Sequence, residues 1–404
     1  MNHRRVNRRR GAVAVAAAAA VVAAAATLLP HADASTDKPG TETPGSPRTF
    51  TSRSAAHLAA SLEPGVREKT AGWYLDGATG RMVVNVTAED AARRVKATGA
   101  VPRLVRNSTA ALRGATRTLS DRASVPGTAW SIDPRTNKVV VTADRTVTGA
   151  KLDALTKVTD RMGHLVRVKR SSGEFKRYEG SPPPAGHGRS GSRTRAQGDA
   201  PGAGALIGGR AIFGGGSRCS LGFNVTVQGA PAFLTAGHCG NASRTWTADQ
   251  AGGTPVGTVT DSQFPGSDFA LVTYDDPNTG AASAVDLLNG TVQQISGAAE
   301  ANVGMRVQRV GSTTGLKDGT VTGLGATVNY GNGDIVNGLI QTDVCAEPGD
   351  SGGSLFADDS AVGLTSGGSG DCTRGGETFF QPVTAALRAT GATLGGDGGA
   401  AAQR

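Results

Sequence analysis

Ser351 stands in the segment AEPGDSGGSLF, residues 346 to 356, where glycines and one acid surround it. A serine acts as a nucleophile when its hydroxyl is exposed on a constrained turn and backbone N–H groups converge where a carbonyl oxygen becomes negative. Glycines that adopt positive φ also make ordinary tight turns with no chemistry. The catalytic interpretation therefore requires a base and an orienting carboxylate elsewhere in the chain.

His238 is the only histidine from Leu206 onward, and it follows an apolar run that would carry it to the end of a strand. A lone histidine can also be an ordinary core or surface residue. Among the acids between His238 and Ser351, Asp268 precedes the apolar run FALVTY, whereas most others stand in polar turns. The Asp268 side chain could therefore be buried, as the acid of a catalytic triad must be. Asp350 adjoins Ser351 and cannot easily reach His238.

The segments that must position these residues predict a β-rich fold. Short alternating runs such as LGFNVTV, RVQRV and GTVTGLGATVNY are separated by glycine and asparagine turns, and helical periodicity returns only at FFQPVTAALRAT. This pattern is typical of a sandwich or a barrel. Glycines within the strands favour barrels, because they suit tight curvature. We expect an all-β catalytic domain over 206–404, with a flexible tail after about residue 391.

All four cysteines lie in this second half of the chain. Four cysteines allow three pairings, and the spacing favours two local loops, from Cys219 to Cys239 and from Cys345 to Cys372. A zinc site is the alternative, but the chain has no C-x-x-C pair and no histidine cluster. We therefore expect disulfides, and neither a metal nor another cofactor.

The first residues have the features of an export signal. MNHRRVNRRRG is a basic head, residues 12–29 are almost wholly Ala, Val and Leu, and HADAS offers an A-x-A cleavage site. A transmembrane helix is the alternative, because the apolar run approaches spanning length, but the small-residue site favours removal. We expect a signal peptide over 1–34, export by the Sec or the twin-arginine route, and a secreted protein with no membrane contact afterwards.

A tryptophan-bearing repeat occupies the first half of the chain. GWYLDGATGRMVVNVT (72–87) aligns with AWSIDPRTNKVVVTAD (129–144), with Trp73 over Trp130. Each copy predicts a strand, a polar turn and a second strand, and a segment with helical spacing follows each. We expect a small α+β domain over 55–178 that contains two hairpin-helix repeats.

Two segments around this domain lack the residues needed for a core. Residues 35–54 are rich in Thr, Pro, Ser and Gly and predict a disordered lead-in. Residues 179–205 are rich in Pro, Gly, Ser and Arg and predict an exposed linker with a processing site.

The net charge of +9 is unevenly distributed along the chain. Residues 206–404 contain 9 Lys and Arg against 17 Asp and Glu, a net charge of −8, so the preceding residues carry +17. Opposite charges on the two halves favour association between them over binding to nucleic acid. We expect no nucleic-acid partner.

The blocks TAGHC, SDFALV and CAEPGDSGG resemble the active-site blocks of chymotrypsin-like serine proteases, and residues 206–391 resemble the secreted bacterial streptogrisins. GSTTG, ATVNYG and GLTSGGSG strengthen the resemblance, and the N-terminal half resembles the pro-region of streptogrisins and α-lytic protease. The resemblance implies two six-stranded antiparallel β-barrels and a serine endopeptidase made as a pre-pro-enzyme. It also implies that the pro-region is an intramolecular chaperone and inhibitor until it is removed.

The resemblance further implies a role for each active-site residue. His238 would be the general base and then the general acid, Asp268 would orient it, and Ser351 would form the acyl-enzyme. The backbone N–H groups of Gly349 and Ser351 would form the oxyanion hole. An internal arginine is expected to pair with the acid beside the serine, which gives an ion pair between Asp350 and Arg309.

The primary specificity pocket is expected to be uncharged. A trypsin-like pocket needs an acid six residues before the serine, where this chain has Cys345, and a glutamate-specific pocket needs a histidine that this region lacks. We therefore expect a preference for large apolar or aromatic residues before the scissile bond. The pocket walls of the family match Ala346, Glu347, Pro348, Ser366, Gly367 and Gly368.

The expected partners are protein or peptide substrates and the chain's own pro-region, and the enzyme is expected to be a monomer. Processing is expected at the bond before or after Leu206. Ser354 follows GDSGG where the family usually has proline.

Three alternatives remain open: a catalytically inactive homologue that acts as a binding module, an enzyme whose role is ester hydrolysis, and a basic half retained as a lasting binding domain.

Overall fold

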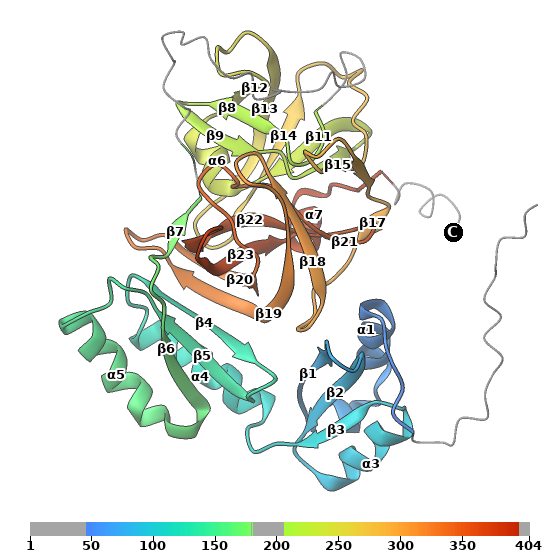
Figure 1. Cartoon of the computed structure of the whole chain (residues 1–404), viewed down its shortest axis with the longest axis vertical. Helices are drawn as coiled ribbons and strands as arrows, with labels where there is room; N and C mark the ends of the chain where they lie inside the picture. The colour runs from blue at the N-terminus through green and yellow to red at the C-terminus, as the bar shows by residue number, and fades with distance from the viewer. Residues whose placement is uncertain (1–45, 179, 181–205, 396–404) are drawn as a thin grey trace, which may run out of the picture. The chain divides into compact units, whose positions relative to one another are not determined.

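The computed structural model describes residues 46–178, residue 180 and residues 206–395 (Figure 1). The expected signal peptide, most of the lead-in and almost all of the linker lie outside the described residues, as do residues 396–404. No helix within the described ranges has both the length and the apolar character needed to cross a membrane.

Two similar α+β units form the N-terminal region. In each unit an antiparallel hairpin is followed by a helix and by a third strand that pairs in parallel with the hairpin. The first unit contains β1 (Thr70–Asp76), β2 (Arg81–Val86), α3 (Glu89–Ala97) and β3 (Val101–Leu104). The second contains β4 (Thr128–Asp133), β5 (Lys138–Ala143), α5 (Ala150–Met162) and β6 (Val166–Arg170). The other helices are α1 (Ser52–Ser61), α2 (Pro64–Arg67), α4 (Thr109–Arg122) and the 3₁₀ turn η1 (Gly163–Leu165).

An aspartate at the equivalent position forms the turn of each hairpin. Asp76 Oδ1 accepts a hydrogen bond from the backbone N–H of Ala78 at 2.9 Å, and Asp133 Oδ1 accepts one from Arg135 at 2.9 Å. Such side-chain to backbone bonds two residues on stabilise a turn without a further partner. The polar turns of the sequence repeat therefore have a shared physical cause.

Ordered structure begins earlier than the expected boundary at residue 55. Helix α1 begins at Ser52, because Thr51 accepts a hydrogen bond from the Ser54 N–H while the Ser54 hydroxyl oxygen accepts one from the Thr51 N–H. This reciprocal cap satisfies donors that the first turn leaves without partners. The prediction of a disordered lead-in up to residue 54 is therefore wrong for its last residues.

The expected catalytic domain is called the catalytic region below, and its described residues are 206–395. Its first antiparallel sheet has seven strands, in the order β10-β11-β14-β13-β12-β8-β9. The sheet has one strand more than the expected six, and the β8–β9 hairpin lies at its end, where β8 pairs with β12. The strands are β8 (Ala211–Gly214), β9 (Ser217–Ser220), β10 (Phe223–Val227), β11 (Ala230–Thr235), β12 (Thr245–Thr247), β13 (Pro255–Gln263) and β14 (Phe269–Tyr274).

The second sheet contains a closed barrel of six strands. Its order is β18-β21-β22-β23-β20-β19, and β18 also pairs with β19, which closes the ring. The strands are β18 (Arg306–Gly311), β19 (Gly315–Asn329), β20 (Ile335–Thr342), β21 (Ser354–Ala357), β22 (Ser360–Asp371) and β23 (Gly375–Pro382). The prediction of an all-β catalytic domain preceded by an α+β region is confirmed.

Short elements complete the catalytic region. They are α6 (Gly237–Ala242), β15 (Ala284–Asp286), β16 (Val292–Gln294), β17 (Gly297–Ala298) and α7 (Val383–Thr390). One apolar core joins the two sheets, with Leu271 of the first and Leu364 of the second in the same buried cluster. This shared core fixes the two sheets against each other, so that side chains from both can meet at their junction.

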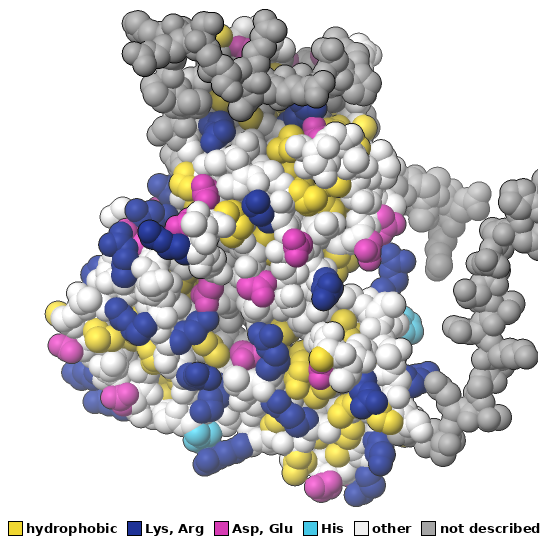
Figure 2. All heavy atoms as spheres, in the orientation of Figure 1, with side chains coloured by type: hydrophobic (Ala, Val, Ile, Leu, Met, Phe, Trp, Pro, Cys, Tyr) yellow, Lys and Arg dark blue, Asp and Glu magenta, His cyan; other side chains and the backbone are white. Residues whose placement is uncertain are grey.

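The N-terminal region extends the second sheet. Strand β4 pairs with β19, with Trp130 opposite Thr327, and β5 and β6 continue the sheet outward. A further strand, β7 (Lys176–Arg177), pairs with β22. On the face shown in Figure 2, Lys and Arg side chains are most frequent over the N-terminal region. Ion pairs join the two regions: Lys169 contacts Glu377, and Arg177 lies 3.6 Å from Asp334.

The chain remains ordered beyond the expected start of the tail at residue 391. The backbone N–H groups of Thr226 and Thr393 each donate to the carbonyl of the other, at 2.8 and 2.9 Å. Leu394 is buried in the core that joins the two sheets. Residues 392–395 are therefore part of the fold, because they add a paired segment to β10.

Candidate active site

His238 is held at the start of α6, directly after β11. Its backbone N–H donates to Asp268 Oδ1 at 3.0 Å, and its ring Nδ1 lies 2.9 Å from Asp268 Oδ2. The residue before His238 must be glycine, because a Cβ atom on Gly237 would lie 2.1 Å from the carbonyl oxygen of Gln263. The second ring nitrogen, Nε2, lies 2.8 Å from Ser351 Oγ. His238 therefore bridges the carboxylate and the hydroxyl.

Asp268 stands just before β14 and is fully buried. Ser366 Oγ donates to Asp268 Oδ2 at 2.6 Å, and the Asp268 N–H donates to Gln381 Oε1 at 2.8 Å. Burial by itself would raise the pKa of Asp268, but the charge of His238 and hydrogen bonds from His238 and Ser366 outweigh it, and the pKa lies below its usual value. The carboxylate therefore stays ionised and opposite the imidazole.

Ser351 lies on a turn between β20 and β21 whose shape depends on glycine. Gly349 and Gly352 have φ values of +100° and +82°, a region that other residues rarely adopt. A Cβ atom on Gly352 would also lie 2.0 Å from Thr235 Oγ1. Ser220 anchors the turn, because its N–H donates to the Ser351 carbonyl at 2.7 Å and its hydroxyl donates to the Gly349 carbonyl at 2.8 Å.

A buried ion pair lies directly beneath this turn. Arg309 Nη1 of β18 lies 3.0 Å from Asp350 Oδ2, and both side chains are fully buried. Thr314 links the two, since its hydroxyl accepts from Arg309 Nη2 at 2.6 Å and donates to Asp350 Oδ2 at 2.7 Å. Burial lowers the pKa of the Arg309 guanidinium, and the Asp350 carboxylate opposes that change. Each charge therefore compensates the desolvation of the other.

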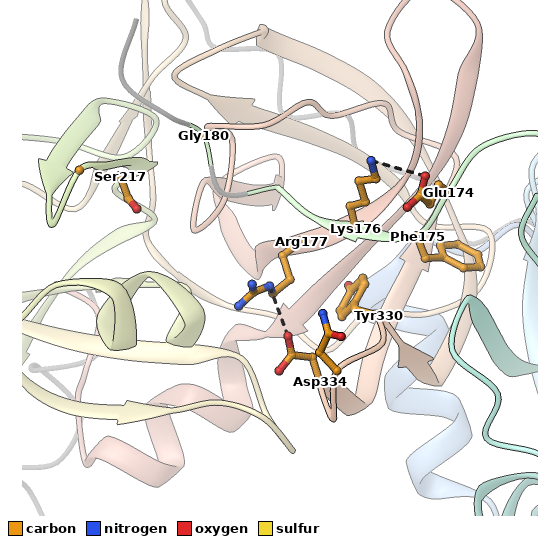
Figure 3. A pocket seen from close by; sticks show the side chains of 10 residues that line it. Glu174, Phe175, Lys176, Arg177, Gly180, Ser217, Tyr330 and Asp334 are labelled. Atoms are coloured by element: carbon orange, nitrogen blue, oxygen red, sulfur yellow. Dashed lines mark ion pairs between the residues drawn. The ribbon is translucent and has the colours of Figure 1, made fainter. Parts of the chain in front are cut away.

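Two of the expected pocket residues, Ser366 and Gly368, lie against Tyr178 of the N-terminal region. Tyr178 is 4% exposed, and a Cβ atom on Gly368 would lie 2.7 Å from its hydroxyl oxygen. The Tyr178 N–H donates to the Ser366 carbonyl at 3.3 Å, and the Gly349 N–H donates to the Tyr178 carbonyl. A polar cavity of about 370 Å³ adjoins this segment, and Figure 3 shows Lys176 and Arg177 at its edge. Ala346 is buried, and Glu347 accepts a hydrogen bond from the Cys372 N–H at 3.1 Å.

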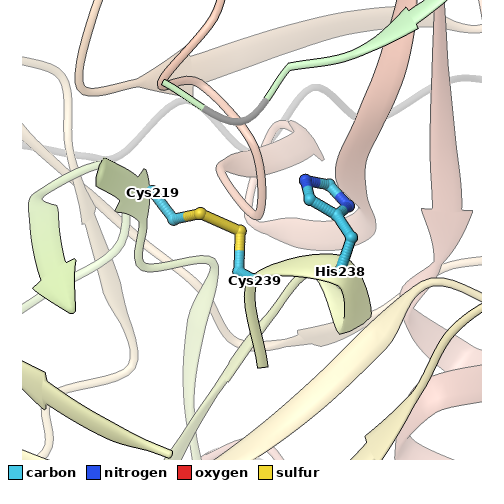
Figure 4. A group of neighbouring side chains, drawn as sticks. All are labelled: Cys219, His238 and Cys239. Carbon is cyan, nitrogen blue, oxygen red and sulfur yellow. A yellow bond between two sulfur atoms is a disulfide. The ribbon is translucent and has the colours of Figure 1, made fainter. Parts of the chain in front are cut away.

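The four cysteines form the two local pairs that their spacing favours. Cys219 bonds to Cys239, and Cys345 bonds to Cys372. His238 lies beside the first pair, so that three potential metal ligands come together (Figure 4). The two sulfur atoms are bonded to each other, however, and neither can act as a thiolate ligand.

Several residues at the site were not predicted from the sequence. Ser366, expected only as a pocket wall, also donates to the buried Asp268, and Gln381 holds the Asp268 backbone. Thr314 stands in the GSTTG block, but nothing in that block indicates a contact with both members of an ion pair. Tyr178 could have been noticed, because it is an aromatic residue just before the expected linker.

The departure at Ser354 has a local explanation. Ser354 is the first residue of β21 and is fully buried, and its hydroxyl donates to the Gly222 carbonyl at 2.6 Å. The bond ties the strand that follows the serine turn to the first sheet. Proline could not make it, because it has no hydroxyl.

A closed barrel joined to a second antiparallel sheet, with His, Asp and Ser at their junction, defines the chymotrypsin-like class of serine proteases. The "Trypsin" family model matches residues 208–389. The models "Alpha-lytic protease pro N-terminal" and "Alpha-lytic protease prodomain" match residues 43–105 and 107–163.

Comparison with individual proteins shows the family within this class. The chain is 46% identical to streptogrisin-D of Streptomyces griseus over 395 residues, which cover 98% of this chain and 92% of that protein. It is 48% identical to glutamyl endopeptidase 2 of the same organism over 47% of this chain and 99% of that protein. The crystal structure of Cellulomonas bogoriensis chymotrypsin is 48% identical, with a TM-score of 0.42, and covers 47% of this chain and 98% of that one. The chain belongs to the streptogrisin family of serine proteases and carries an α-lytic-type pro-region.

Proposed function

We propose that this protein is a secreted serine endopeptidase, made as a pre-pro-enzyme, that cleaves peptide bonds after large apolar or aromatic residues through an acyl-enzyme. The observation that carries the proposal is the pair of contacts on the His238 ring, 2.8 Å to Ser351 Oγ and 2.9 Å to Asp268 Oδ2. A nucleophile bonded to a base that a buried carboxylate orients is the arrangement needed for acyl transfer.

The proposed reaction has two steps that use the same residues. Ser351 Oγ attacks the substrate carbonyl carbon while His238 Nε2 takes the hydroxyl proton and then gives it to the leaving amine. Water then enters, His238 removes its proton, and hydrolysis of the ester returns the Ser351 hydroxyl. Asp268 holds the Nδ1–H tautomer and stabilises the imidazolium throughout.

The N–H groups of Gly349 and Ser351 are the proposed oxyanion hole. Donors of this kind act on the charge that develops in the transition state, and loss of one typically costs about 10²–10³ in turnover. We propose that the buried pair of Asp350 and Arg309 keeps these donors in place, because it lies under the turn that presents them.

The proposed substrate preference is supported by the side chain that lies between the pocket walls. Tyr178 is buried there, and burial of a large aromatic side chain is strongly favourable. Glutamyl endopeptidase 2 makes preference for glutamate the second candidate. That candidate is not favoured, because the proposed pocket walls carry an acid, Glu347, and none of them is basic.

The remaining parts of the proposal concern the rest of the chain. The signal-like N-terminus supports secretion, and the pro-region is the proposed intramolecular chaperone and inhibitor. The two cross-region ion pairs support association of the oppositely charged halves rather than binding of nucleic acid. A monomer is proposed for the processed enzyme.

A serine-directed aryl phosphonate tests the proposal against an inactive binding module. We expect one equivalent of label on Ser351 of the processed protein, and none on the Ser351→Ala or His238→Ala variant. The matched control is Ser360→Ala, which alters a serine of β22 outside the site and should label fully. Absence of label on correctly folded wild type would favour the binding module, and a preference for esters over peptides would favour the esterase alternative.

A further inference from the structure

The segment that ends the N-terminal region runs through the proposed active site as an added strand. Strand β7 pairs antiparallel with β22, with Arg177 opposite Gly367 and Lys176 opposite Gly368. A Cβ atom on Gly367 would lie 2.3 Å from the Lys176 carbonyl oxygen. Main-chain pairing to an edge is how extended peptides are commonly bound. The cleft therefore holds this segment as it would hold a peptide substrate.

The carbonyl of Tyr178 makes a contact that is expected of a scissile carbonyl. It accepts a hydrogen bond from the Gly349 N–H, one of the two proposed oxyanion donors. The Tyr178 side chain fills the proposed specificity pocket, where burial raises the pKa of its hydroxyl. Tyr178 therefore places its side chain in the proposed specificity pocket and its carbonyl on a proposed oxyanion donor.

Backbone pairing resumes two residues after Tyr178, at Gly180. The Gly180 N–H donates to the Arg218 carbonyl at 3.1 Å, and the Arg218 N–H donates to the Gly180 carbonyl at 2.7 Å. Arg218 adjoins the disulfide beside His238. A Cβ atom on Gly180 would lie 2.8 Å from the backbone nitrogen of Gly349. Backbone pairing therefore flanks Tyr178 on both sides, as it flanks the scissile residue of a bound peptide.

Side chains before Tyr178 add further contacts. The Arg177 guanidinium lies 5.4 Å from the centre of the Phe264 ring, which in turn packs edge-on against the His238 ring at 5.7 Å. Arg177 also lies 3.6 Å from Asp334, an ion pair visible in Figure 3. Both contacts hold the Arg177 side chain, and one of them is made to the ring that packs against His238.

We propose that the enzyme's first self-cleavage is at the Tyr178–Glu179 bond, in the same molecule, and precedes the separate cut near Leu206. The inference rests on the proposed function. Ser351 Oγ forms an ester with the Tyr178 carbonyl carbon as the C–N bond breaks, and His238 passes the serine proton to the nitrogen of Glu179. Water then hydrolyses the ester, which leaves a carboxylate on Tyr178, a new amino terminus at Glu179 and a free Ser351.

Two cuts, rather than one, follow from the length of chain between the sites. Residues 179–205 separate Tyr178 from Leu206, so the first cut leaves them attached to the catalytic domain. A second cut at the bond before or after Leu206 then releases them. The first cut gives the N-terminal region a new carboxyl end at Tyr178, and the side chain of that residue fits the proposed specificity pocket.

The direct test follows the full-length chain from its synthesis, with intact masses and N-terminal sequences of quenched samples. We expect a fragment that ends at Tyr178 and a partner that begins at Glu179 to appear before any fragment that begins at Leu206 or Ile207. The rate should not depend on protein concentration, because the cut is intramolecular. A pro-fragment that reaches residue 205 or 206 with the Tyr178–Glu179 bond intact would overturn the proposal.

Substitutions outside the catalytic machinery sharpen the test. Gly180→Val should slow the first cut by about tenfold or more, because its side chain would press on the Gly349 backbone, while fully processed enzyme should cleave a Phe peptide at the wild-type rate. Gly186→Val in the same linker is the matched control and should cut normally. Tyr178→Phe should also cut normally, and Tyr178→Asp should not. Equal first-cut rates for wild type and Gly180→Val would overturn the inference.

The two proposals fail in different ways. If the wild type neither accepts the phosphonate nor cleaves added peptides, the proposed function fails, and this inference fails with it. If the enzyme is labelled and cleaves peptides but the Tyr178–Glu179 bond survives, only this inference fails.

Discussion

At the scale of single residues, Asp268 is a buried charge whose carboxylate accepts hydrogen bonds from three donors: the backbone N–H and ring Nδ1 of His238, and the Ser366 hydroxyl. Asp268→Asn should lower kcat for a Phe peptide by about 10⁴, because an amide favours the wrong imidazole tautomer. The control Asp275→Asn alters an exposed acid and should leave kcat unchanged. Steady-state kinetics at neutral pH would measure both, and a loss below tenfold would contradict the role given to Asp268.

The lowered pKa of Asp268 also makes a prediction about stability and pH. A carboxylate whose folded-state pKa is below its unfolded value of about 3.9 contributes stability above that value, and loses the contribution as pH falls through the folded-state pKa. In a Ser351→Ala background, the loss in free energy of unfolding caused by Asp268→Asn should therefore shrink below about pH 4. Urea titrations of the two proteins between pH 2 and 6 would show it, and a pH-independent loss would contradict it.

Arg309 is predicted to act on turnover through Asp350 and the serine turn. Arg309→Ala should lower kcat by about 10² or more and destabilise the fold by about 3–5 kcal/mol, because it leaves a buried carboxylate uncompensated. Arg306→Ala, on the same strand but exposed, is the control, and Arg309→Lys should recover part of the loss. If kcat of folded Arg309→Ala equals that of wild type, the ion pair has no role in catalysis.

His238, Asp268 and Ser351 could be proposed from sequence because each stands beside a short block with a local physical signature. Ser366 and Gln381 could not, because their contacts with Asp268 span 98 and 113 residues of sequence. Nothing in either local sequence distinguishes a polar residue that faces the triad from one that faces solvent. Thr314 was overlooked for the same reason.

At the scale of elements, the Cys345–Cys372 disulfide joins the pocket segment to the end of β22 across a separation of 27 residues. Replacing both cysteines by alanine should cost roughly 2–5 kcal/mol and raise KM for a Phe peptide more than it lowers kcat. Denaturant unfolding and kinetics would measure the two effects. An unchanged KM would mean that the disulfide does not support the pocket.

The strand pattern of the catalytic region could be predicted because short alternating runs and glycine turns are local features. The strand order could not, because β4 and β7 join the second sheet from a region more than 150 residues away in sequence from their partners. The early start of α1 was missed because a capping box formed by Thr51 and Ser54 looks like ordinary polar sequence.

At the scale of the whole molecule, ion pairs between oppositely charged side chains join the pro-region and the catalytic region. Lys169 contacts Glu377, but the Lys169 side chain is 41% exposed, so the pair should contribute less than about 1 kcal/mol. Glu377→Gln should therefore weaken inhibition by added pro-region by up to about fivefold, and salt should remove most of that difference. Glu300→Gln, whose partner Arg388 lies within the catalytic region, is the control. A salt-independent inhibition constant would contradict electrostatic association.

Turnover of succinyl peptides that end in Phe, Leu, Arg or Glu, by wild type and by Ser351→Ala, tests the central claim most directly. We expect wild type to cleave the Phe and Leu peptides well above the Arg and Glu peptides, and the variant to cleave none. Preference for Arg or Glu would contradict the assignment of the pocket. Equal turnover by Ser351→Ala would contradict the triad, and no turnover by correctly processed wild type would contradict the protease itself.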